Sequence, residues 1–80
     1  MEKKIIKIEE EFITLGQLLK FESIISSGGM AKWYLSEFPV TLNGEPENRR
    51  GKKLYNGDVI SFLNEKLEVT ISSPIQKNEN

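Results

Sequence analysis

The sequence contains neither cysteine nor histidine. These absences exclude disulfides, thiol nucleophiles, zinc sites of cysteine and histidine, and catalysis by a histidine base. No hydrophobic run approaches the roughly 18 residues of a membrane-spanning helix. The amino-terminal stretch MEKKIIKIEEEF also lacks the apolar core of about seven or more residues that a signal peptide needs. We therefore expect a cytoplasmic, non-enzymatic protein with no membrane partner, cofactor, metal site, catalytic residue or small-molecule substrate.

The length of the chain also limits the number of domains and the size of any cleft. The chain has 80 residues, of which 38% are hydrophobic and 29% charged. A chain this short cannot divide into two self-sufficient cores, and it leaves little room for a deep catalytic cleft. We expect one domain over residues 1–73, followed by a polar tail over 74–80 that frays.

Positive charge is concentrated in the middle of the chain. The whole sequence has 11 Lys and Arg against 12 Asp and Glu, for a net charge of -1. Nevertheless four cations fall within five positions, in the run Arg49, Arg50, Gly51, Lys52, Lys53. Residues 28–55 have net charge +2, whereas 1–27 and 56–80 have -1 and -2. This asymmetry predicts a local basic surface directed at one anionic partner.

Apolar spacing predicts two short helices after a first strand. Residues 4–8, KIIKI, favour a strand at a sheet edge, where lysine discourages further pairing. Thr14 and Gln17 then form a capping-box pattern for a helix over about 15–25. The run SSGG at 26–29 interrupts it, and a second helix is expected over about 29–37.

The second helix has one face suited to packing on the first, formed by Ala31, Tyr34, Leu35 and Phe38. Lys32 and Trp33 point elsewhere, and Pro39 ends the helix. From residue 40 the period is two. The stretch VTLNGEPE predicts a strand that runs into a turn at Asn43-Gly44, and further turn signals at Asn56-Gly57-Asp58 and Asn64-Glu65 accompany strands at about 59–63 and 67–72. The order predicts an α+β fold, in which two helices cover one face of a small antiparallel sheet of four to five strands.

Each candidate binding feature also has a purely structural explanation. Arginine binds phosphate through paired hydrogen bonds and lysine as a point charge, but the run 49–53 also fits a solvated loop. Trp33 beside Lys32 fits stacking on a base, or simple cover for the sheet edge. The serines and glycines at 26–29 fit phosphate binding at a helix start, or an ordinary cap. The three glutamates at 9–11 fit a solvated face, because alternate strand residues do not converge on a metal.

Taken in order, these features resemble a known family. The two helices with their serine-rich break, then VTLNG at 40–44 and NGDVISF at 56–62, are similar to the S-four (alpha-L) RNA-binding domain. The chain looks most like its small bacterial members, the YaaA-like proteins, and the resemblance covers about residues 13–63. It implies an alpha-L motif and binding of structured RNA, ribosomal RNA or a ribosomal particle in particular, with a role in ribosome assembly or maturation.

The resemblance also implies which residues contact RNA. The family surface is built from the second helix and the hairpin after it, which here implicates Ser27, Lys32, Trp33, Asn43, Arg49, Arg50, Lys52 and Lys53. Two positions depart from the family. Gly28 stands where an arginine usually follows the serine, which removes a phosphate contact, and Phe38-Pro39 stands where a glycine commonly ends the helix.

One alternative from another class stays open. VTLNGEP and LYNGDVISF also resemble small β-grasp sulfur carriers and related adaptors. Those carriers need a carboxy-terminal Gly-Gly, and this chain ends in QKNEN. The remaining alternative is a β-grasp-like adaptor that binds proteins and no nucleic acid.

Overall fold

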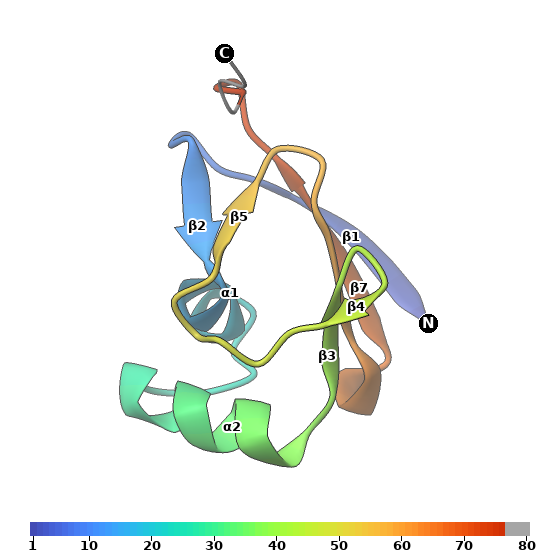
Figure 1. Cartoon of the computed structure of the whole chain (residues 1–80). Helices are drawn as coiled ribbons and strands as arrows, with labels where there is room; N and C mark the ends of the chain where they lie inside the picture. Colours follow the sequence, from blue (N-terminus) through green and yellow to red (C-terminus); the bar gives the residue numbers. More distant parts are fainter. Residues whose placement is uncertain (77–80) are drawn as a thin grey trace.

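The computed structural model describes residues 1–76, and these form an α+β fold, as predicted. The structure has two helices, α1 (Leu15–Phe21) and α2 (Ala31–Glu37), and two sheets; α2 lies at one end of the molecule and α1 nearer its middle (Figure 1). A short 3-10 turn, η1 (Gly28–Met30), leads into α2. The part of the predicted tail beyond residue 76 lies outside the described residues.

The larger sheet has five strands in the order β1-β7-β6-β3-β4. Their bounds are Glu2–Lys7 for β1, Val40–Leu42 for β3, Glu45–Pro46 for β4, Val59–Phe62 for β6 and Leu67–Ser72 for β7. The 3-10 turn η2 (Leu63–Glu65) joins β6 to β7. As predicted, β1 is an edge strand.

The sheet is mixed, where the sequence predicted an antiparallel one. Strand β1 runs parallel to β7, with Glu2 opposite Leu67 and Lys7 opposite Ser72. The other pairs in this sheet are antiparallel. An alternating pattern shows which face of a strand is buried but not the direction of its partner, and no short hairpin joins β1 to β7 to fix that direction.

A second sheet pairs β2 (Phe12–Thr14) with β5 (Lys53–Tyr55). It was not predicted, because β5 begins at Lys53, the last residue of the basic run, and has one buried apolar side chain, Leu54. This pairing brings the basic run next to the start of α1. Figure 1 shows the connection from β4 to β5 curving round α1.

Helix α1 begins as predicted and ends earlier. Thr14 and Gln17 form the capping box, since the Gln17 amide donates to Thr14 Oγ1 (3.2 Å) and the Thr14 amide donates to Gln17 Oε1 (2.8 Å). The helix was expected to reach residue 25, but Ser23 adopts φ 60° and turns the chain. Ile25 then enters the core as part of a loop.

The core lies between the helices and the sheets. Leu18 and Leu19 of α1 and Tyr34 and Leu35 of α2 are buried, which confirms the predicted packing face. Phe62 on β6 is fully buried among them. Tyr34 also donates a hydrogen bond to Glu65 Oε2 (3.1 Å), and burial together with this carboxylate raises the pKa of Tyr34 to about 12. Among residues 1–76, no helix is long and apolar enough to cross a membrane.

Candidate functional site

Backbone hydrogen bonds fix the basic run against the start of α1. The amide of Leu15 donates to the carbonyl of Lys52 (2.9 Å), and the amide of Gly16 donates to the carbonyl of Arg50 (2.8 Å). These amides belong to the first turn of the helix, where no carbonyl within the helix is available to them. A Cβ on Gly16 would lie 3.3 Å from the Arg50 carbonyl oxygen, so glycine permits this close approach. The basic run is therefore anchored, although its side chains face water.

Arg49 is held by a nearby carboxylate. Its Nε and Nη2 donate to Oε2 and Oε1 of Glu47 at 2.9 and 3.0 Å, and its backbone amide donates to Oε2 at 3.0 Å. The Glu47 side chain is 9% exposed, whereas that of Arg49 is 69% exposed. The hydrogen bonds from the guanidinium lower the pKa of Glu47 to about 2. Arg49 therefore organises the loop, and Glu47 compensates much of its charge.

Arg50 borders a hollow between the basic run and the two helices. The hollow measures about 420 Å³ and is lined by Lys20 of α1, Gly28 of η1, and Arg50 and Gly51 of the basic run, among others. A Cβ at Gly28 or Gly51 would meet no atom within 4 Å, so both glycines leave the hollow open. Lys20 was missing from the predicted contacts. It is exposed on α1, but only the fold places it near a run thirty residues later in the sequence.

A second hollow continues this surface on the other side of Gly51. Arg49, Gly51, Lys52, Lys53 and Tyr55 line it. The Lys53 ammonium lies 4.8 Å from the ring centroid of Phe12, a cation–π contact that leaves the charge in place. We call the cations around Gly51 the basic surface, which comprises Lys20, Arg49, Arg50, Lys52 and Lys53.

The predicted site residues near α2 are exposed, and no described hydrogen bond or ion pair links them to the basic surface. Ser27 precedes η1 in an extended conformation, and its side chain forms no cap hydrogen bond. Lys32 is exposed on α2. Trp33 is 53% exposed, and its ring packs edge-on against Phe38 at a centroid distance of 5.9 Å. Much of the Trp33 ring is therefore accessible at the surface.

Asn43 is engaged within the fold. It adopts φ 52° in the turn between β3 and β4. Its Oδ1 accepts from the Val59 amide (2.9 Å), and its Nδ2 donates to Asp58 Oδ1 (3.1 Å). Asp58 Oδ2 accepts in turn from the Tyr55 amide (2.7 Å). The two motifs VTLNG and NGD therefore meet in space and together fix the end of β5, the strand that begins at the last residue of the basic run.

Comparison with known proteins decides the family. The model of the S4 domain matches residues 6–70 of the chain. The chain belongs to the S4 domain family. The sequence had predicted this membership from residues 13–63, and the match extends further, to the last two residues of β1 and to most of β7.

A curated protein gives a second comparison for this S4 domain. The probable ribosome maturation protein RlbA of Bacillus subtilis (strain 168) is 64% identical over 57 residues. The aligned region covers 71% of this chain and 80% of that protein.

Proposed function

We propose that this S4 domain is a non-enzymatic, cytoplasmic protein that binds structured RNA, and that its target is ribosomal RNA or an assembling ribosomal particle. Membership of the S4 domain family and the similarity to a probable ribosome maturation protein support this role. The observation that carries the proposal is the anchoring of the basic run. Cations held on a fixed backbone lose less conformational freedom on binding phosphates than cations on a mobile loop.

The proposed contacts are mainly to phosphate. Arg50, Lys52 and Lys53 extend from the anchored backbone, and Lys20 faces the same hollow as Arg50. These side chains suit the backbone of a folded RNA, whose shape and phosphates give most contacts to proteins that bind double-stranded regions. Arg49 acts in part by positioning the loop through Glu47.

The contacts near α2 complete the proposed surface. Ser27 precedes η1 and Lys32 lies in the first turn of α2, and both residues are exposed. Trp33 offers an accessible ring for an unpaired base. Asn43 lies at an exposed turn and additionally positions Asp58.

In-cell crosslinking followed by sequencing of the bound RNA tests the proposal. The tagged protein is compared with an Arg50→Glu/Lys52→Glu variant and with a Lys3→Glu/Lys7→Glu control, which changes the same net charge on exposed positions of β1. We expect enrichment of one region of ribosomal RNA, lost in the first variant and kept in the control. No enrichment above background, with the protein folded, would favour a protein adaptor instead.

A further inference from the structure

An apolar groove lies beside the basic surface, and its apolar residues have no role in the proposed RNA contacts. It measures about 660 Å³, and its apolar lining comes from Ile8, Phe12, Ile13 and Phe21. Phe21 is 63% exposed, although the same helix buries Leu18 and Leu19 almost completely. Together with the partly buried Ile8, Phe12 and Ile13, Phe21 forms a continuous apolar surface, and such surfaces are typical of sites that a partner covers.

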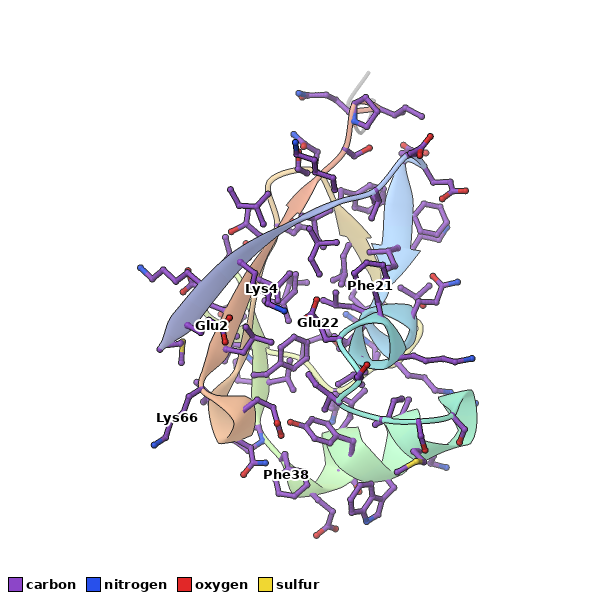
Figure 2. The ribbon with its side chains drawn as sticks, turned by 180° about the vertical axis from the view of Figure 1, so that it is seen from behind. Glu2, Lys4, Phe21, Glu22, Phe38 and Lys66 are labelled. Carbon is purple, nitrogen blue, oxygen red and sulfur yellow. The ribbon has the colours of Figure 1, made fainter. Side chains whose placement is uncertain are left out.

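An ion pair ties β1 to the end of α1 beside the groove. Lys4 Nζ on β1 donates to Glu22 Oε1 at 2.9 Å, and the Glu22 side chain is 5% exposed. Figure 2 shows Lys4 and Glu22 facing each other, with Phe21 beside them at the end of α1. A second hollow, lined by Ile5 and Phe21 among others, continues the groove along β1. Because this ion pair ties β1 to the end of α1, it also holds the neighbouring Phe21 in place. Phe21 therefore needs little rearrangement to receive a ligand.

The charges at the rim indicate the chemistry of that ligand. Glu10 and Glu11 line the groove, and Glu9 precedes them. None of the three forms a salt bridge within the described part of the chain. These carboxylates would repel a phosphate backbone and attract lysine or arginine. RNA is therefore disfavoured as the occupant, and a basic polypeptide segment is favoured.

The groove and the basic surface meet. Lys20 lines both the groove and the hollow at Arg50. Lys53 of the basic surface lies over Phe12 of the groove. A segment seated in the groove would thus run beside an RNA bound at the basic surface.

We propose that the groove binds a lysine- or arginine-rich protein segment that inserts one aromatic or aliphatic side chain against Phe21 and places its cations on Glu10 and Glu11. Such a composition suits a protein that itself contacts RNA. The S4 domain would then join an RNA and a basic protein at adjacent surfaces. This interaction does not depend on the proposed RNA binding, because its residues differ from the phosphate contacts except for Lys20.

Nuclear magnetic resonance titration with a synthetic lysine-rich peptide containing one central phenylalanine tests the groove. We expect amide shifts at Ile8, Phe12, Ile13 and Phe21, and at least about tenfold weaker binding by a Phe21→Ser variant, as for a central anchor of an interface. Leu63→Ser is the matched control, since Leu63 is exposed on η2, outside the groove. A peptide with serine in place of phenylalanine, and an acidic peptide that keeps the phenylalanine, should both bind weakly.

The charge requirement is tested separately. Glu10→Lys/Glu11→Lys should weaken peptide binding by a similar factor. Glu37→Lys/Glu45→Lys, which changes two exposed glutamates elsewhere, should leave peptide binding unchanged. Absence of binding, or shifts confined to other surfaces, would overturn the proposal. It would also be overturned if oligouridine displaced the peptide and shifted the groove amides, which would assign the groove to RNA. Sedimentation showing a dimer that Phe21→Ser dissociates would assign it to a second copy of the chain.

Discussion

Replacing Arg49 with alanine should destabilise the protein, whereas the same replacement of Arg50 should not. Arg49 makes two side-chain hydrogen bonds to Glu47, and the Glu47 side chain is only 9% exposed. Arg50 has no described side-chain hydrogen bond or salt bridge, and its carbonyl, which binds Gly16, is retained in the variant. Hydrogen bonds between charged groups are stronger than neutral ones, and the exposure of Arg49 reduces their contribution toward that of a surface pair.

We therefore expect Arg49→Ala to lower Tm measurably, because the Glu47 carboxylate is left without its strongest partner. For a domain of this size each kcal/mol lowers Tm by about 4–8 °C, which thermal unfolding followed by circular dichroism resolves easily. Arg50→Ala is the matched control. If the two variants melted at the same temperature, the Arg49–Glu47 pair would not anchor the loop.

The pH dependence provides an independent check on this pair. The pKa of Glu47 is lowered from its ordinary 4.5 to about 2 in the folded protein. A lowered folded-state pKa stabilises the protein above pH 4.5, and this contribution is lost as the pH falls from 4.5 toward 2. The Tm difference between the wild type and Arg49→Ala should therefore be largest near neutrality and shrink across this window. A difference that stayed constant down to the lower limit would contradict the assignment.

Two further substitutions test the turns that support the site. Asn43→Ala should lower the free energy of unfolding in denaturant by about 2 kcal/mol, because it removes the hydrogen bonds to Val59 and Asp58 and forces alanine into φ 52°. Asn48→Ala, at an exposed position, should leave that free energy unchanged. Equal losses in the two variants would refute the role of the Asn43 side-chain amide. Gly44→Ala should cost about 1 kcal/mol, since Gly44 has φ 85°, whereas Gly51→Ala should leave stability unchanged, since both sites have open space but Gly51 has no positive φ. Equal stabilities of these two variants would show that backbone conformation at Gly44 is not limiting.

Local signals in the sequence predicted much of the fold. The capping box at Thr14 and Gln17 and the helical spacing of Ala31, Tyr34 and Leu35 depend on neighbours within one or two turns, so sequence alone indicates them. The turn at Asn43-Gly44 was likewise predicted from its local chemistry.

Long-range pairing could not be predicted in the same way. The parallel direction of β1 on β7 and the pairing of β2 with β5 join segments far apart in the sequence. The hydrophobic pattern of a short strand such as Lys53–Tyr55, with one buried residue, is too weak to specify a partner.

The candidate site shows the same division. The concentration of cations at 49–53 is visible in the sequence, and so is the glycine among them. That the backbone of this run is bound to the first turn of α1 depends on the fold. The approach of Lys20 to Arg50 also depends on it, as does the compensation of Arg49 by a mostly buried Glu47.

The salt dependence of RNA affinity tests the central claim most directly. Four cations of the basic surface, Lys20, Arg50, Lys52 and Lys53, form no salt bridge among the described residues. If each engages one phosphate, the logarithm of the affinity for purified ribosomal RNA should fall against the logarithm of salt concentration with a slope of about -2.8 to -3.6. Arg50→Ala should reduce the magnitude of the slope by about 1, and Lys3→Ala should leave it unchanged. A slope near zero, or one that Arg50→Ala does not alter, would contradict RNA binding by the basic surface.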